Sequence, residues 1–278
     1  GGTLAHIKDS VAPTDVKDGV ERFIRDTFAP LYAKVGLDAN TTLDKENPVQ
    51  ATLLRTPVVN MVAVQGKLPA ARDELRKRGA LYLGLKADGS PGDGKIHPEA
   101  IDPNIADQAV IVAIQDMGAK AADAAMALLK SERNAVVRGR LIGALDRSND
   151  PSVAAKTRDL LLNGNLRVNE VPMVVQGATR ERANQAAGWQ WFKQNFEAIK
   201  KKTPEGGRGG LDLVLDGRVD LVAVLGEGLL GLVQQLLAGV LRLDQLLRRL
   251  VLVGVHLGVL DHLLDLVLGQ AGAALDAD

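Results

Sequence analysis

The sequence predicts an all-α fold: a HEAT/armadillo-like α-solenoid of helix pairs, followed by a poorly ordered C-terminal tail rich in Leu and Val. Three observations support this prediction. Apolar residues recur at helical spacing through residues 1–210, with little alternation of period two. The helical segments are short and closely spaced, so each must bury its apolar face against a neighbour. From residue 211 onward the residue usage changes abruptly.

The composition is that of a globular chain without a strong charge preference. Of the 278 residues, 46% are hydrophobic, which is enough to bury a sizeable core. Lys and Arg number 34, as do Asp and Glu, so no net field favours nucleic acid or an anionic membrane as partner. The absence of cysteine excludes disulfides and thiolate metal sites. Because the sequence starts Gly-Gly-Thr, we expect a fragment whose compartment, cytoplasmic or periplasmic, is undetermined.

Helices of the first half are recognised by a stripe of apolar residues with a period of 3.6. The stripe is clearest in residues 20–35, where Pro30 must kink the helix. We expect further helices at residues 49–64 and 68–85. A loop is expected around the Ser-Pro-Gly-Asp-Gly segment at residues 90–94.

Helices of the second half begin and end with recognisable signals. They are expected at residues 101–117, 119–129, 135–145, 151–162, 168–175 and 182–199. Asp150 can cap the helix that follows it, because Pro151 occupies the first turn, where its missing N–H costs nothing. The Asn-Gly-Asn segment at residues 163–165 should end that helix.

Four segments follow the order of landmarks of a known family. They are FIRDTFAPLYAKVG at 23–36, LLR at 53–55, LIGAL before NDP at 141–151, and GWQWFKQNF at 188–196. Over roughly residues 15–210 the chain resembles the C-terminal domain of the gluzincin zinc aminopeptidases, which include aminopeptidase N, puromycin-sensitive aminopeptidase and the endoplasmic-reticulum aminopeptidases. The resemblance implies a helical superhelix that caps the catalytic domain and encloses a peptide chamber.

The catalytic motifs of that family are missing from this sequence. Family catalysis needs a His-Glu-x-x-His helix, which places two imidazoles one turn apart on zinc, and a Gly-x-Met-Glu-Asn type loop for the free amino terminus of the peptide. None of His6, His97, His256 and His262 is followed by the required Glu and second His. We therefore expect no catalytic residue, metal ligand or cofactor in this chain, and no activity of the chain alone. Zinc would belong to the parent enzyme.

Two arginines are the candidate substrate-binding residues. Arg180 and Arg182 open the last expected helix, and in the family an arginine near Arg180 belongs to the inner wall of the chamber. A guanidinium suits a peptide carboxylate because two parallel N–H donors meet two oxygens. The alternative is that both are solvated surface arginines. The partners implied are the catalytic domain of the same polypeptide and peptide substrates, with no nucleic acid and no membrane span.

Other motifs have structural explanations. Residues 88–99 span the length of an EF-hand loop, but Asp93 stands where Gly is required and Lys95 where an apolar residue is usual, so we expect a solvated loop. The G-x-G-x-x-G match at residues 226–231 lacks a surrounding βαβ unit. Trp189, Phe192 and Phe196 share one helical face and are expected to pack in the core.

The tail, residues 211–278, uses nine residue types, namely Leu, Val, Asp, Gly, Arg, Ala, Glu, Gln and His. Apart from alternative Leu and Arg codons, these residues have codons beginning with G or C, and they make up about three-fifths of ordinary protein. This bias is typical of an antisense or frame-shifted read of a GC-rich gene, so we predict no evolved fold or family domain after residue 210. Decoded from the opposite strand, part of the tail resembles the helical lid of a DnaK-type chaperone, which assigns no chaperone function here.

Two functions remain open on the sequence alone. The first is a non-catalytic C-terminal domain of a zinc metallo-aminopeptidase that caps the active-site chamber and helps bind peptides. The alternative is a stand-alone helical-repeat adaptor that binds a protein partner on a concave face. A membrane-active protein would depend on the tail, whose longest uncharged stretch, residues 228–241, is shorter than the ~20 residues of a bilayer span.

Overall fold

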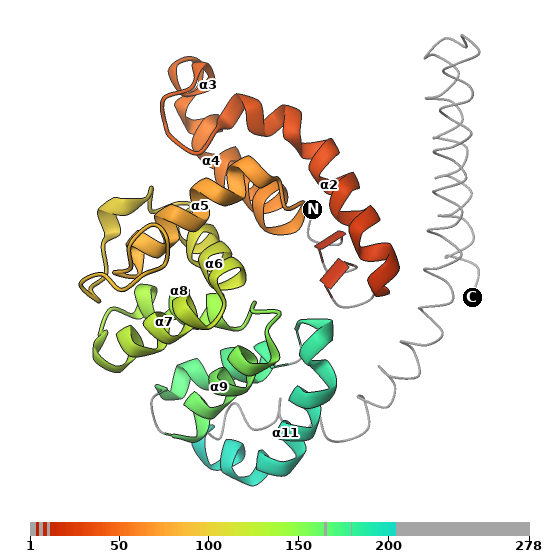
Figure 1. Cartoon of the computed structure of the whole chain (residues 1–278), viewed down its shortest axis with the longest axis vertical. Helices are drawn as coiled ribbons and strands as arrows, with labels where there is room; N and C mark the ends of the chain where they lie inside the picture. The colour runs from red at the N-terminus through yellow and green to blue at the C-terminus, as the bar shows by residue number, and fades with distance from the viewer. Residues whose placement is uncertain (1–3, 6–7, 10–11, 164–165, 179, 204–278) are drawn as a thin grey trace. The chain divides into compact units, whose positions relative to one another are not determined.

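The computed structural model describes residues 4–5, 8–9, 12–163, 166–178 and 180–203 (Figure 1). Within these residues the elements are helices, and the one β-bridge, between Leu85 and Pro91, is isolated. The all-α fold is therefore confirmed, and the arrangement of helix pairs as a solenoid stays a prediction. The expectations for residues 211–278 and for the motif at 226–231 lie outside the described residues.

The helix bounds agree with the sequence prediction most closely in the second half. In chain order the elements are α2 Thr14–Val35, α3 Thr42–Glu46, α4 Pro48–Val59, the π-helix η2 Asn60–Gln65, α5 Pro69–Tyr82, the 3-10 helix η3 Pro98–Ala100, α6 Ala106–Met117, α7 Ala119–Ser131, α8 Ala135–Leu145, α9 Pro151–Leu162, the 3-10 helix η4 Val168–Glu170, α10 Val171–Gly177 and α11 Arg182–Lys202. The helix expected at 49–64 is divided into α4 and η2. The one expected at 101–117 starts five residues later, because turns precede Ala106.

Local signals explain where the helices begin and end. The Asp150 side chain accepts a hydrogen bond from the amide of Ser152, and Pro151 is the first residue of α9, as predicted. Asn134 caps α8 in the same way, at the amides of Val136 and Val137. Between α6 and α7 the chain turns at Gly118, whose φ of 58° is the left-handed conformation that glycine adopts without strain.

The π-helix η2 positions the polar residue Gln65 beside the later helices. Pro57 lies inside α4 and has no N–H to donate, and the wider π turn starts three residues after it. All five residues from Met61 to Gln65 are buried. The turn ends where the amide of Gly66 donates to the carbonyl of Met61.

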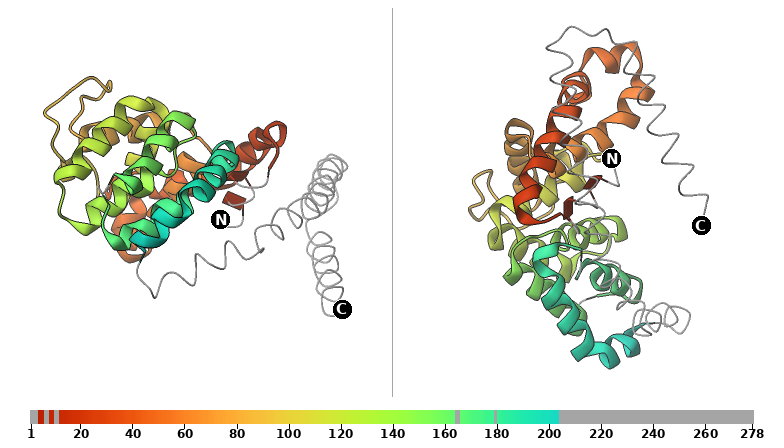
Figure 2. Two further views of the ribbon diagram at one scale, coloured as in Figure 1. Left: turned by 90° about the horizontal axis from the view of Figure 1, so that it is seen from below. Right: turned by 90° about the vertical axis from the view of Figure 1, so that its right-hand side faces the viewer.

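The core is centred on α6, which packs against α5, η2, α7 and α8. Figures 1 and 2 show these helices succeeding one another in chain order, so that contacts join mainly elements close in sequence. Residues 108–114 of α6 are all buried. The closest approach is at Gly79 of α5, where an added Cβ would lie 2.2 Å from the carbonyl oxygen of Ala109.

The aromatic residues of α11 belong to the same core. Phe192 is buried, its ring centroid is 5.6 Å from that of Trp189 in a stacked pair, and it meets the edge of Phe196 at 5.7 Å. Offset and edge-to-face contacts of this kind add to the burial of the rings. The prediction that these aromatic residues pack in the core is confirmed.

Candidate functional site: a charged cavity

A cavity of about 410 Å³ lies where the N-terminal segment meets α2, η2, the loop between α8 and α9, and the start of α11. Its charged lining consists of five cations and two carboxylates: Lys8, Lys17, Lys67, Arg147 and Arg180, with Asp9 and Glu181. Amides from Asn60, Gln65, Gln115 and Asn149 complete its polar surface. A volume of a few hundred Å³ is enough to enclose a small molecule.

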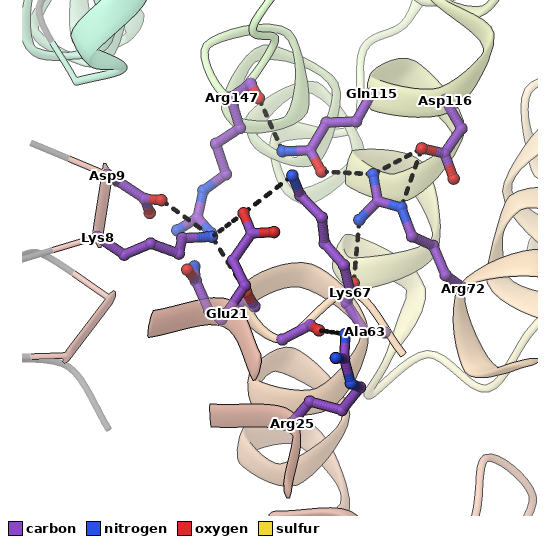
Figure 3. A network of polar contacts seen from close by, with 12 residues as sticks. Lys8, Asp9, Glu21, Arg25, Ala63, Lys67, Arg72, Gln115, Asp116 and Arg147 are labelled. Carbon is purple, nitrogen blue, oxygen red and sulfur yellow. Dashed lines mark hydrogen bonds and ion pairs between the residues drawn. The ribbon is translucent and has the colours of Figure 1, made fainter. Parts of the chain in front are cut away.

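Two of the cations are neutralised by neighbouring carboxylates (Figure 3). The Nζ of Lys8 donates to the carbonyl of Gln65 at 3.2 Å and lies 3.1 Å from Asp9 and 3.9 Å from Glu21. Lys67 approaches the same Glu21 carboxylate at 2.9 Å. Burial lowers the pKa of Lys8, and the nearby Asp9 carboxylate opposes that shift. These ion pairs tie the N-terminal segment to α2 and η2.

A second network holds the loop that carries Arg147. Arg72 donates to the Gln115 side chain at 3.0 Å and to Asp116 at 2.7 Å, and it also reaches the carbonyl of Ala63 at 3.0 Å. Gln115 in turn donates to the backbone carbonyl of Arg147 at 2.9 Å (Figure 3). The backbone of Arg147 is thus fixed through α6 and α5.

The guanidinium of Arg147 differs from these groups. No residue in the described part of the chain forms a hydrogen bond or ion pair with it, although its side chain points toward Lys8 and Asp9 in Figure 3. Burial lowers the pKa of Arg147, and the like charge of Arg180 lowers it further. The cavity therefore holds two guanidinium groups close enough to repel each other.

Two carboxyl groups near these arginines titrate close to neutral pH. Burial raises the pKa of Glu181 to about 7, assisted by the Asp9 charge and opposed by Lys17 and Lys8. Asp146, the residue after α8, lies under Gly177, where an added Cβ would be 2.2 Å from its carboxyl carbon. Burial also raises the pKa of Asp146 to about 7, against the charge of Arg180. The charge of the cavity consequently depends on pH.

The two arginines predicted from the sequence have different positions. Arg180 lines the cavity, whereas Arg182, the first residue of α11, is exposed and is not among the lining residues. A role for either in substrate binding stays a prediction. Lys8, Arg147 and Glu181 were not identified from the sequence. The polar segment between two expected helices at residues 146–150 was the one available signal for Arg147.

The described residues contain no group of three or more His, Cys, Asp or Glu that could hold a metal ion. His97 comes nearest, with Nδ1 2.8 Å from Glu99 and Nε2 3.0 Å from Asp93. Because the carboxylates bond to opposite ring nitrogens, they do not converge on one point. These residues do not fit a zinc site, and the absence of zinc from the whole chain stays a prediction.

The loop at residues 88–99 uses its acidic groups internally. Asp88 accepts hydrogen bonds from the amide and hydroxyl of Ser90, and Asp93 accepts one from the amide of Lys95. This pattern agrees with a solvated loop. His6, His256 and His262 lie outside the described residues. No helix in the parts of the chain described above is long and apolar enough to cross a lipid bilayer.

Comparison with known families identifies the helical part. The family model of the ERAP1-like C-terminal domain matches residues 2–217, most of the chain. A second model, NAD-specific glutamate dehydrogenase, matches residues 202–278, the segment where we expected no family domain. The two matches overlap at residues 202–217, which include the composition change at residue 211. No curated protein matches the chain. The chain belongs to the ERAP1-like C-terminal domain family.

Proposed function

We propose that the chain is the non-catalytic C-terminal domain with which a zinc metallo-aminopeptidase caps its active-site chamber and helps bind peptide substrates. The observation that carries this proposal is the family match over residues 2–217. The partner is the catalytic domain of the same polypeptide, which supplies the zinc ion and its ligands. This domain acts by geometry, since it closes the chamber and limits how a peptide enters it.

Arg180 and Arg182 are the residues assigned to peptide binding. Arg180 lines a cavity that also contains Arg147 and Lys17, so an incoming carboxylate meets several positive charges there. A guanidinium can bind a carboxylate through two parallel hydrogen bonds. Arg182 lies at the N-terminal end of α11, where helix N–H groups also favour a negative charge. A peptide long enough to reach this surface gains affinity that a dipeptide-like substrate does not.

Kinetics with two lengths of substrate test the proposal. Joined to its catalytic domain, the Arg180→Ala variant should raise KM about tenfold for long peptides, which corresponds to the loss of one charged hydrogen-bonding partner. KM for an aminoacyl anilide should not change, because that substrate does not reach Arg180. Arg22→Ala, at an exposed arginine of α2, serves as the matched control.

Two outcomes would reject the assignment of Arg180. Equal losses with long and short substrates would indicate a folding defect, and unchanged kinetics would make Arg180 a surface residue. The chain without its catalytic domain should neither hydrolyse the anilide nor bind stoichiometric zinc. Chelator-sensitive turnover by the purified chain would contradict the proposal as a whole.

A partner surface on α4 tests the alternative of a stand-alone adaptor. Val49 and Leu53 lie one helical turn apart and are 68% and 71% exposed, an unusual position for two large apolar side chains. If the domain caps a catalytic domain through this surface, Leu53→Asp should weaken their association. Association that is unaffected by Leu53→Asp would place the catalytic domain elsewhere and leave α4 available to a different protein.

A further inference from the structure

We propose that the charged cavity is a binding site for a phosphate group, either free inorganic phosphate or the phosphate of a small molecule. The site would be formed by Arg147, Lys17 and Arg180 as cations, and by Gln65 and Glu181 as hydrogen-bond acceptors. This inference does not depend on the aminopeptidase assignment, because it follows from the arrangement of charges inside the cavity.

The cations of the cavity are not all neutralised by the protein. Lys8 and Lys67 have the carboxylates of Asp9 and Glu21 as partners. Arg147 and Lys17 form no ion pair with any residue that the structure describes. With five cations and the four carboxylates of Asp9, Glu21, Asp146 and Glu181, the described residues of this region keep a positive charge when all these groups are ionised.

An oxyanion would relieve the repulsion between the two arginines. Arg147 and Arg180 line the same cavity, and the charge of Arg180 makes the charged form of Arg147 less favourable. A tetrahedral oxyanion that accepts hydrogen bonds from the Arg147 guanidinium places a negative charge beside both arginines, which offsets their repulsion. The backbone of Arg147 is already held by Gln115, so the side chain is presented from a fixed position.

The acceptors in the cavity indicate phosphate rather than sulfate. Gln65 is 3% exposed, and its buried Oε1 has no hydrogen bond within the described residues. Glu181, 5% exposed, adds a second acceptor to the lining of the cavity. Sulfate has no proton to donate to these oxygens at neutral pH, whereas hydrogen phosphate has a P–OH group. The cavity thus offers cations for the phosphate oxygens and acceptors for the remaining proton.

The size of the cavity allows more than a bare ion. A volume of about 410 Å³ accommodates a phosphate together with a small polar group such as a sugar ring. Hydroxyl groups of that kind could donate to Gln65 and Asn149, which also line the cavity. A phosphorylated small molecule would therefore donate hydrogen bonds to more of the acceptors in the cavity than free inorganic phosphate would.

Calorimetric titration of the full chain tests the site. In a phosphate-free buffer at pH 7, inorganic phosphate should bind saturably with one site per chain, and sulfate at equal ionic strength should bind at least about tenfold more weakly. Arg147→Gln should weaken phosphate binding by about tenfold, as expected for loss of one charged hydrogen-bonding partner. Arg22→Gln, at an exposed arginine of α2, should leave the phosphate affinity unchanged.

Hexose 6-phosphate binds more tightly than inorganic phosphate if the natural ligand is a small molecule, and more weakly if it is the free ion.

Three results would overturn the proposal. They are the absence of saturable phosphate binding, equal binding of phosphate and sulfate, and unchanged phosphate affinity in Arg147→Gln. Should Arg147→Gln lose its helical circular dichroism, Lys17→Gln replaces it, because Lys17 lies on the surface of α2 that faces the cavity. Lys17→Gln should lower the phosphate affinity, and an unchanged affinity in that folded variant would also reject the site.

Discussion

Arg138, in the first half of α8, and Arg147, in the loop after α8, lie in contrasting environments. Arg138 is 4% exposed, and its guanidinium meets both oxygens of Glu170, at 2.6 and 2.7 Å. It also donates to the carbonyl of Leu129 at 2.6 Å. Arg147, nine positions later, has its backbone fixed by Gln115 but no carboxylate partner for its guanidinium among the described residues. The comparison teaches that burial alone does not separate a structural arginine from one that can bind a ligand, whereas the presence or absence of a counter-charge does.

The physical difference lies in how each guanidinium is compensated for lost hydration. Arg138 exchanges water for a bidentate carboxylate and backbone carbonyls, which links α8 to η4 and to the end of α7. Arg147 retains access to the cavity, and with it to solvent or to a ligand. The first arginine is therefore expected to be important for stability and the second for binding.

Removal of the ion pair between Arg138 and Glu170 should have the largest effect on stability. Arg138→Met leaves the Glu170 carboxylate buried without its partner, so we expect a loss of about 3–5 kcal/mol in the free energy of unfolding. Urea denaturation followed by circular dichroism measures this loss. The double variant Arg138→Met/Glu170→Leu should recover most of it, because no unpaired charge is left. A loss below about 1 kcal/mol in the single variant would remove the contrast between the two arginines.

Substitution of Gly188 should have the next largest effect, because it forces α11 away from Ala178, which lies two residues before the cavity residue Arg180. An added Cβ at Gly188 of α11 would lie 2.0 Å from the carbonyl oxygen of Ala178, so the two segments must move apart. We expect Gly188→Ala to lower the free energy of unfolding by about 1–3 kcal/mol. The matched control is Gly139→Ala in α8, where nothing lies within 4 Å. That change should instead add about 0.5–1 kcal/mol through helix propensity. Equal effects at both positions would contradict close packing at Gly188.

Glu181 should give the cavity a dependence on pH near neutrality, whereas the Arg138 region should depend on pH only in the acid range, because the pKa of Glu170 is lowered. Its pKa rises from 4.5 in the unfolded chain to about 7 in the fold, chiefly through burial. Between these two pH values the unfolded chain releases the proton that the folded chain retains. The free energy of unfolding therefore falls as the pH rises from about 4.5 to about 7. Glu181→Gln should therefore stabilise the protein at pH 8, by on the order of 2 kcal/mol, and have little effect at pH 4.5. Urea denaturation at the two pH values measures the difference, and a pH-independent effect would refute it.

The helices could be predicted from the sequence better than the site, for a physical reason. The start of α9 at Pro151 depends on the adjacent Asp150, and such local signals are visible in the sequence. The division of residues 49–64 into α4 and η2 could not be predicted from the sequence, because a π turn keeps nearly the same apolar pattern as an α-helix. The cavity was missed because it joins segments distant in sequence, such as those of Lys8 and Arg147. Helical periodicity shows which side of a helix is buried, but not which helix covers it. Arg180 was assigned from a family resemblance alone.

The smallest expected effect on stability is at Arg147 itself. Arg147→Met removes a partly desolvated charge and its repulsion with Arg180, while the hydrogen bond from Gln115 to the backbone carbonyl is retained. We expect the free energy of unfolding to stay the same or to rise by up to about 1 kcal/mol, in contrast to the large loss for Arg138→Met. Arg147→Lys, which keeps the charge, should show no gain. Millimolar phosphate should stabilise the wild-type chain through preferential binding to the folded state and should not stabilise Arg147→Met. A side chain without a partner inside the protein has no native interaction worth more than about 2 kcal/mol to lose. If Arg147→Met without phosphate lowers the free energy of unfolding by more than about 2 kcal/mol, Arg147 is instead a structural residue comparable to Arg138.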